Sequence, residues 1–205
     1  MIAHHIYSFD GHSPRILPGA YVHPSACLIG DVQIGEGCFV GPQATLRADH
    51  GPIRLEAMSN VQDNCVLHAS PGGAVVLHRF AQAGHGAVLH GCTLMENCLV
   101  GIHATVLDGA VLGPDSLLAA HSLLTTGVRT EAGSLYAGSP AHFMKSQSRD
   151  AIAAQREGAL RYARAAAEYR RSLRPVADQT ANLRAVTWGG PAVASVLDPR
   201  PRRAA

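Results

Sequence analysis

The sequence is poor in charged and aromatic residues and has no long apolar run. Of its 205 residues, 16% are charged and 5% are aromatic. The absence of any run of about 18 apolar residues argues against a transmembrane helix, and the opening segment MIAHHIYSFDG lacks the basic and apolar regions of a secretory signal. The net charge is only +2, and the sequence has no basic groove for nucleic acid. We therefore expect a soluble, cytoplasmic protein with no membrane and no nucleic-acid partner.

A disulfide framework is also missing. The five cysteines are an odd number, and no two of them have the CxxC spacing. Such a set is typical of reduced thiols rather than of a secreted disulfide scaffold. The apolar content comes mainly from small aliphatic residues, and the 21 glycines favour an architecture of closely stacked backbones.

What the sequence does contain is an aliphatic residue at every sixth position. The series has three segments: Val22, Leu28, Ile34, Val40 and Leu46; then Leu55, Val61 and Leu67; then Val88, Leu94, Val100, Val106, Leu112, Leu118 and Leu124, ending at Thr130 and Tyr136. A period of six matches neither a helix nor a simple alternating strand, but it matches a hexapeptide β-helix, in which three short strands form one triangular coil. We predict an all-β, left-handed parallel β-helix over residues 1–146, an exception to the usual right-handed crossover.

Four residues after each aliphatic position, the residue is usually small. Cys38, Cys65, Cys92 and Cys98 all occupy this slot. A buried thiol packs like a small hydrophobic side chain. We therefore predict that these cysteines are packing residues at the corners of the coils and not catalytic nucleophiles.

Two insertions interrupt the period, and the composition changes near the end. RADHGPIR lies between Leu46 and Leu55, and HASPGGAVVLHRFAQAGHGA lies between Leu67 and Val88; such insertions in solenoids form loops on one face. An Ala-, Arg- and Glu-rich segment then predicts a C-terminal α-helix over residues 147–174, with Ser148 as its N-cap. Residues 175–205 have no period and predict an extended or disordered tail.

Three of the twelve histidines cluster around the second insertion. His68 ends the segment NVQDNCVLH, and His85 and His90 lie in GHGAVLHGC. Three neutral imidazoles that leave a fourth position to water are the ligand set of a catalytic zinc site, and iron(II) or cobalt can use the same ligands. The alternative is that they are polar corner residues of the repeat.

The period separates these histidines in space. His68 and His90 are 22 positions apart, about one coil plus a loop, so they can stack on one face. His85 lies five positions before His90 and should sit near the neighbouring corner. A three-fold oligomer would solve the problem, because His85 of one subunit can face His68 and His90 of the next.

Residues 10 to about 145 resemble the γ-class carbonic anhydrase-like family of hexapeptide proteins. The resemblance lies in LRADHGPI, NVQDNCVLH, GHGAVLHGC and YAGSPA, together with the hexapeptides. It implies a homotrimer with interfacial metal sites, in which His68 and His90 come from one subunit and His85 from its neighbour. Within the family, the sequence is most similar to a phenylacetate-degradation branch and then to a carnitine-operon branch.

The resemblance also implies roles for six further residues. Gln62 matches the residue that positions the metal-bound water, Asn60 supports its loop, and Tyr136 matches a tyrosine that lines the site, although Tyr136 is equally the last aliphatic-slot residue of the repeat. The remaining three match residues at the trimer interface: Arg47, Asp49 and Asp63.

One departure from the family affects the expected reaction. The segment ASPGGAVV after His68 contains no carboxylate, where the founding enzymes carry a glutamate that shuttles protons. His50 or His78 could replace it only if its ring reaches the site. The first hypothesis is therefore a metal-dependent hydrolase that attacks CoA thioesters with a metal-bound hydroxide, zinc being the expected metal. The alternatives are a carbonic anhydrase that hydrates CO2 to bicarbonate, a hexapeptide acyltransferase, and a non-catalytic trimeric assembly subunit.

Overall fold

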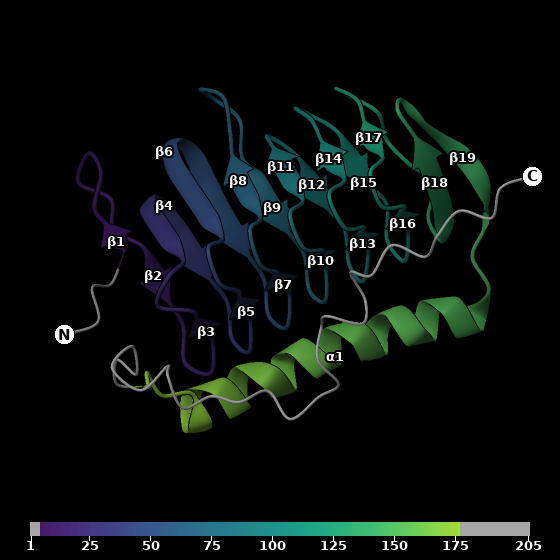
Figure 1. Ribbon diagram of the computed structural model, residues 1–205. Coiled ribbons are helices and arrows are strands. Elements are labelled where there is room, and N and C mark those ends of the chain that lie inside the picture. The colour runs from purple at the N-terminus through teal and green to yellow at the C-terminus, as the bar shows by residue number, and fades with distance from the viewer. Residues whose placement is uncertain (1–4, 177–205) are drawn as a thin grey trace, which may run out of the picture. The chain divides into compact units, whose positions relative to one another are not determined.

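The computed structural model describes residues 5–176. The predicted tail, residues 175–205, therefore lies outside the described residues except for its first two. Within the described residues, the chain up to Leu173 forms one compact unit. That unit is a left-handed parallel β-helix with one C-terminal helix, as the hexapeptide period predicts (Figure 1).

The strands stack in parallel ladders that make three faces of a triangular prism. The first face consists of the opening parts of β4 (Cys27–Ile34) and β6 (Thr45–Leu55), then β8 (Val66–His68), β11 (Val88–His90), β14 (Thr105–Val106) and β17 (Leu123–Leu124). The second face consists of the closing parts of β4 and β6, then β9 (Val75–Leu77), β12 (Thr93–Leu94) and β15 (Val111–Leu112).

The third face carries the longest regular stack. It consists of β3 (Tyr21–Val22), β5 (Phe39–Val40), β7 (Asn60–Val61), β10 (Gln82–Ala83), β13 (Leu99–Val100), β16 (Leu117–Leu118), β18 (Ser134–Gly138) and β19 (Ala141–Ser146). The last pair, β18 and β19, is antiparallel. This hairpin ends the β-helix and was not predicted from the sequence.

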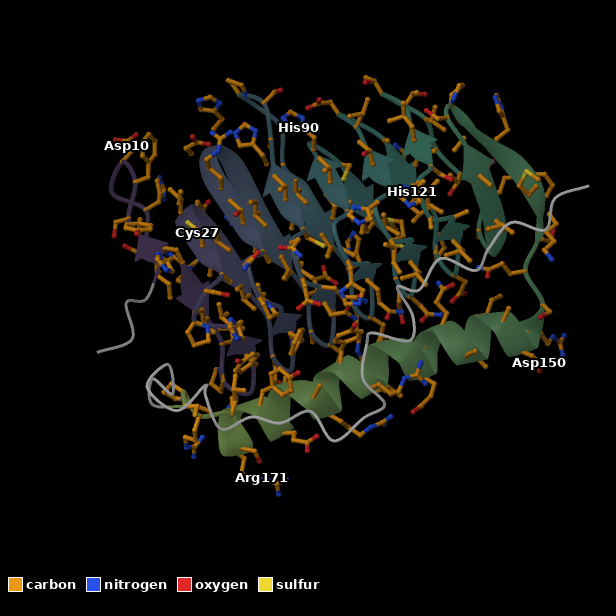
Figure 2. The ribbon with its side chains drawn as sticks, in the orientation of Figure 1. Asp10, Cys27, His90, His121, Asp150 and Arg171 are labelled. Carbon is orange, nitrogen blue, oxygen red and sulfur yellow. The ribbon has the colours of Figure 1, made fainter. Side chains whose placement is uncertain are left out.

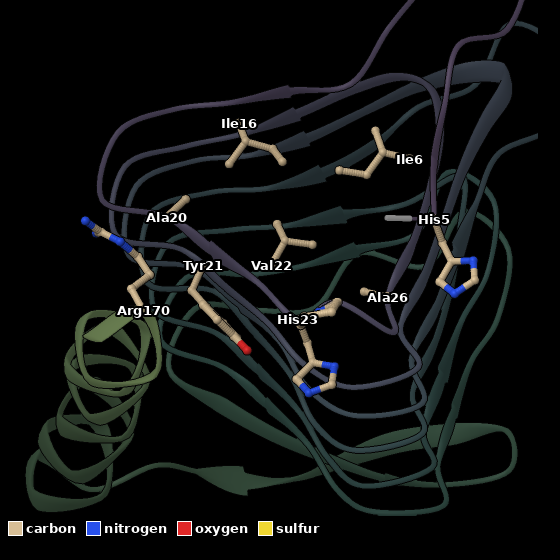
Figure 3. Close-up of a pocket in the computed structure, with 10 residues that line it drawn as sticks. His5, Ile6, Ile16, Ala20, Tyr21, Val22, His23, Ala26 and Arg170 are labelled. Carbon is tan, nitrogen blue, oxygen red and sulfur yellow. The ribbon is translucent and has the colours of Figure 1, made fainter. Parts of the chain in front are cut away.

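The first coil of the β-helix borders a cavity. Strands β1 (Ile6–Tyr7) and β2 (Arg15–Ile16) pair with β4. Figure 3 views this region along the prism axis and shows Arg170 of the C-terminal helix beside Ala20 and Tyr21. The cavity has a volume of about 390 Å³.

The interior is a column of stacked aliphatic side chains, because each coil adds one inward residue per face. Leu28, Leu46, Leu67 and Leu89 stack in register on the first face and are fully buried. The expectation that Val88 belongs to this series is wrong. Val88 is 36% exposed, whereas Leu89 is fully buried and is the inward residue of this coil. The spacing from Leu89 to the next inward residue, Leu94, is five positions instead of six, so counting back by six from Leu94 gives the wrong residue.

The cysteines confirm the prediction for the small corner slot. Cys38, Cys65, Cys92 and Cys98 are all buried and unpaired. Burial raises the pKa of the Cys65 thiol to about 11 and that of Cys92 to about 12. Burial thus favours the neutral thiol at both positions, as expected for packing residues rather than catalytic nucleophiles.

Helix α1 (Arg149–Ser172) packs along the third face (Figure 1). The Ser148 side chain accepts a hydrogen bond from the Ala151 N–H, which satisfies one free donor of the first turn and confirms the predicted N-cap. Tyr162 and Tyr169 pack against Phe39. Among the described residues, no helix is both long enough and apolar enough to cross a membrane.

Candidate metal centre

His68 and His90 lie side by side on the first face, where each is the last residue of its strand, β8 and β11. Parallel pairing of β8 with β11 places His90 opposite His68, and pairing of β6 with β8 places Arg47 opposite His68 on the other side. The His68 Nδ1 and His90 Nε2 atoms are 3.1 Å apart. Figure 2 shows His90 on the edge of the β-helix remote from α1. The structure thus brings two of the three predicted ligands together within one chain.

Each of these imidazoles is fixed by a carboxylate on its other nitrogen. Asp49 Oδ1 lies 3.0 Å from His68 Nε2, and Asp108 Oδ2 lies 2.8 Å from His90 Nδ1. A carboxylate bonded to the remote nitrogen is the usual support of a metal-binding histidine, because it sets the tautomer and the direction of the ring. The two nitrogens left over are the ones that face each other.

The electrostatics of this pair favour neutral His68. Burial lowers the pKa of His68, and the positive charge of Arg47 lowers it further. Arg47 itself bonds Asp49, with Nη1 and Oδ2 2.5 Å apart. Burial is the largest single influence on Asp49 and raises its pKa, but the hydrogen bonds from Arg47, His68 and the backbone, together with the charge of Arg47, outweigh it, so the pKa of Asp49 is lowered. A neutral imidazole can donate its lone pair to a cation without first losing a proton.

A glycine makes room for one of the supporting carboxylates. Gly91 has φ of +56°, and a Cβ atom there would collide with the side chain of Asp108. Glycine adopts this backbone region at less cost than residues with a Cβ atom. Gly91 therefore lets the Asp108 side chain lie over the chain and reach His90.

His85 occupies the corner between the third and the first face. Its Nδ1 lies 2.6 Å from Asp63 Oδ2, and its Nε2 lies 3.5 Å from the Tyr162 hydroxyl. Among the described residues, no group of three metal-binding side chains contains His85. The structure therefore separates His85 from His68 and His90 within one chain, as the repeat geometry predicts, while giving it a carboxylate support of the same kind.

Gln62 and Asn60 belong to the corner that holds His85. The Gln62 amide donates to Asn60 Oδ1 over 3.1 Å, and both side chains are buried. Gln62 directly precedes Asp63, which contacts His85. The buried Nδ2 of Asn60 has no protein partner, so this amide has a free donor. Their catalytic roles stay predictions.

Tyr136 lies on β18, stacked in register on Leu118 and packed edge-on against Phe143 with ring centroids 5.9 Å apart. Over residues 5–176, no hydrogen bond or ring contact joins it to His68, His85 or His90. Its position is that of the last aliphatic slot. A role for Tyr136 in lining the site stays a prediction.

Of the two proposed proton relays, only His50 is near the pair. Its ring lies 5.5 Å from the His68 ring, and Asp49, His50 and His68 form a group with ligand atoms within 4.8 Å of one another. His78 follows β9 on the second face, where its Nδ1 lies 3.0 Å from Glu56 Oε1.

Two residues of the centre were missed by the sequence analysis. Asp108 stands 18 positions after His90, which is one coil, so the period could have placed it above that histidine. Tyr162 stands 77 positions after His85 and comes from α1, whose docking no periodic signal encodes. Burial raises the pKa of the Tyr162 hydroxyl, which therefore stays protonated and available as a donor.

The comparisons with known proteins agree with this architecture. A family model described as bacterial transferase hexapeptide (six repeats) matches residues 13–48. The carnitine operon protein CaiE of Salmonella newport is 45% identical over 139 residues, which cover 68% of this chain and 70% of that protein. The predicted resemblance to hexapeptide proteins of the carnitine-operon branch is thereby confirmed.

Solved structures with the same fold extend further along the chain. A hexapeptide transferase family protein from Anaplasma phagocytophilum is 35% identical, covers 82% of this chain and 99% of its own, and has a TM-score of 0.78. A candidate acetyltransferase from Bacillus cereus is 27% identical, covers 81% of this chain and 96% of its own, and has a TM-score of 0.80.

Proposed function

The chain belongs to the hexapeptide-repeat family of the carnitine operon protein CaiE, and on that premise we propose that it is a trimeric, metal-dependent hydrolase of CoA thioesters, similar to PaaY, the protein of the phenylacetate-degradation branch that its sequence resembles. The proposal rests on one observation. His68, His85 and His90 each have one ring nitrogen within 3.0 Å of an aspartate oxygen. The other nitrogens of His68 and His90 face each other, and that of His85 faces the Tyr162 hydroxyl.

This donor set fits a divalent metal. Asp49, Asp63 and Asp108 are three separate carboxylates, each directed at one histidine. Structural ion pairs of histidine do not require three such supports, whereas metal-binding histidines almost always have one each. Zinc is the metal we expect, with iron(II) and cobalt as alternatives that the same nitrogen ligands accept.

A second copy of the chain would complete the ligand set. Three large apolar side chains lie exposed on the first face and at the corner of His85: Val66 (42%), Val88 (36%) and Ile102 (48%). They flank the predicted ligands, and burial of such residues is a driving force for association. A closed three-fold assembly would cover them and bring His85 of one subunit to His68 and His90 of the next.

The residues of the chain would then act in a defined way. When bound, the metal supplies a Lewis acid that makes water acidic enough to ionise near neutral pH. Asp49 and Asp108 hold the rings of His68 and His90 in place, and Asp63 does the same for His85. The Gln62 amide, next to the His85 corner, would orient the attacking water, and the Tyr162 hydroxyl would donate to the thioester oxygen.

Thioester hydrolysis is favoured over CO2 hydration by what surrounds the histidines. The loop after His68, residues 69–74, has no carboxylate to carry protons to buffer, and rapid CO2 hydration depends on such a relay. His50, beside His68, is the observation that favours a carbonic anhydrase as the second candidate. The structural similarity to a candidate acetyltransferase favours chemistry on CoA esters. The two remaining alternatives, an acyltransferase and a non-catalytic trimer subunit, would need no metal.

The test is complementation between two inactive variants. His68→Ala and His85→Ala proteins should each lack bound metal and thioesterase activity towards phenylacetyl-CoA-type esters. Trimers reassembled from equal amounts of both should regain about one quarter of the wild-type activity, because one neighbouring pair in four combines an intact His68 with an intact His85. His78→Ala, which removes a histidine on the second face, is the control and should retain full activity.

The same samples distinguish the candidate functions. Turnover of CO2 without turnover of any thioester would support the carbonic anhydrase. Activity that survives in both histidine variants would exclude a metal mechanism and favour the acyltransferase. Absence of metal from the wild-type protein, measured by elemental analysis after growth with added zinc, would contradict the proposal.

A further inference from the structure

A cavity of about 310 Å³ opens between helix α1 and the third face, directly beside His85. Gln62, His85 and Tyr162 line one part of it. Binding sites for small organic molecules have volumes from about 300 Å³ upwards. The cavity is therefore large enough for an organic group, and it is much larger than CO2 needs.

The walls of the cavity are mainly apolar. Leu99 and Ile102 contribute from the β-helix, and Ala154 and Gly158 contribute from α1. Ala154 and Gly158 are four positions apart, so they lie on the same side of the helix. Because both are small, α1 can lie close to the third face without filling the space: a Cβ atom at residue 158 would already come within 3.3 Å of Gln82 Oε1.

The amides at the far end of the cavity are engaged within the protein. Gln82 Nε2 donates to the Gln155 carbonyl oxygen over 2.9 Å. Gln155 Nε2 in turn bonds the carbonyl oxygens of Asn97 and Ser116. Because these donors already have acceptors, they do not require a polar ligand. The other polar side chains that line the cavity are those of Gln62, His85, Arg161 and Tyr162.

We propose that this cavity binds the acyl group of the thioester and selects acyl groups of about six to ten carbons over shorter ones. The inference rests on the proposed function, because it places the reacting carbonyl at His85. The apolar acyl chain or ring then fills the space between Leu99 and Ala154, while the thioester carbonyl remains beside Tyr162. Burial of each additional methylene strengthens binding about fourfold, so the cavity favours a hexanoyl or phenylacetyl group over an acetyl group.

Filling the cavity from α1 tests the inference. Ala154→Leu should lower kcat/KM for hexanoyl-CoA and phenylacetyl-CoA at least about tenfold, and should change kcat/KM for acetyl-CoA less than about twofold. Ala153→Leu, at an exposed neighbouring position of the same helix, is the matched control and should leave all three values unchanged. Metal content should equal that of the wild type in both variants.

A second variant excludes loss of folding as the cause. Gly158→Ala raises the helix propensity of α1 while placing a methyl group in the cavity. It should shift selectivity towards acetyl-CoA in the same direction as Ala154→Leu, with a smaller amplitude and little change in thermal stability, because the gain in helix propensity offsets the close contact with Gln82. An equal loss on short and long acyl groups in both variants would overturn the inference.

Binding measurements separate the two proposals. Isothermal titration with phenylacetate, a product of the reaction, should show binding to the wild type and weaker binding to Ala154→Leu. If this difference appears in a protein that hydrolyses no thioester, the cavity assignment stands and the proposed hydrolysis fails. If thioesters are hydrolysed but phenylacetate binds both proteins equally, the cavity assignment fails alone.

Discussion

The coils of residues 46–91 and those of residues 92–130 share one core but differ in what they present outward. In both stretches the inward column is aliphatic and fully buried, as Leu67 and Leu112 illustrate. The earlier stretch carries both insertions and, on one ladder, Arg47, His68 and His90 in register. The later stretch follows the period of six from Leu94 to Leu124 without a break.

This difference means that the inward residues determine stability, whereas the outward residues of the earlier stretch determine the proposed chemistry. The inward residues of both stretches serve the stacking of coils, so their loss should affect folding wherever they are. The outward residues of the first face should affect metal binding only in the earlier stretch. Asp108 is the exception, because it belongs to the regular coils by sequence but bonds His90 of the earlier ones.

The largest effect is expected from a core residue of the regular stretch. Leu112→Ala removes a fully buried side chain and leaves a cavity in the close-packed column, which should lower the free energy of unfolding by about 2–5 kcal/mol. Metal affinity at temperatures where the variant is folded should remain that of the wild type. Denaturant unfolding measures the loss of stability, and a zinc titration measures the metal affinity. A metal affinity that falls together with stability would contradict the separation of core residues from metal-binding residues.

The second effect tests Asp108 as the link between the two stretches. Asp108→Asn removes the carboxylate from His90 Nδ1 and should lower metal affinity about 10–100-fold, the usual result of losing such a support. Asp115→Asn is the control, because Asp115 bonds Asn97 and lies in the regular stretch. Competition with a zinc chelator measures both affinities, and equal values for the two variants would show that Asp108 does not support the metal ligand.

The smallest effect compares two glycines in the left-handed region. Gly91→Ala and Gly109→Ala both place alanine at positive φ, at a cost of about 1–2 kcal/mol. Only at Gly91 would the new Cβ collide with Asp108, whereas at Gly109 the nearest atom is 3.8 Å away. The two variants should therefore lose similar stability, and Gly91→Ala alone should also bind metal more weakly. Identical metal titrations would show that Gly91 is not needed to place Asp108.

The sequence predicts the fold well because a solenoid core is nearly one-dimensional. Each inward slot repeats at a fixed interval, so Leu94, Val100 and the corner cysteines could be assigned by counting. Val88 was assigned wrongly because it lies six positions before Leu94, whereas the inward residue, Leu89, lies only five positions before it. A shift of one position along a strand exchanges the inward and outward sides.

The site is less predictable, because it depends on contacts that the period does not encode. The separation of His85 from the other histidines follows from counting, as does the stacking of His68 and His90. Tyr162 reaches His85 only because α1 docks on the third face through its own side chains. The antiparallel hairpin of β18 and β19, at the end of the repeat, likewise follows no hexapeptide rule.

Helix α1 changes how the whole stack should come apart. In a solenoid each coil contacts only its neighbours, so coils can fray from either end one at a time. In this protein one helix contacts several coils. The Gln155 side chain donates to the carbonyl oxygens of Asn97 and Ser116, and the Gln155 carbonyl oxygen accepts from Gln82. Tyr169 packs on Tyr21 and Phe39. Helix α1 therefore connects the first, middle and late coils, and none of these coils can unfold before the helix undocks from the third face. We expect the β-helix to melt in one cooperative step.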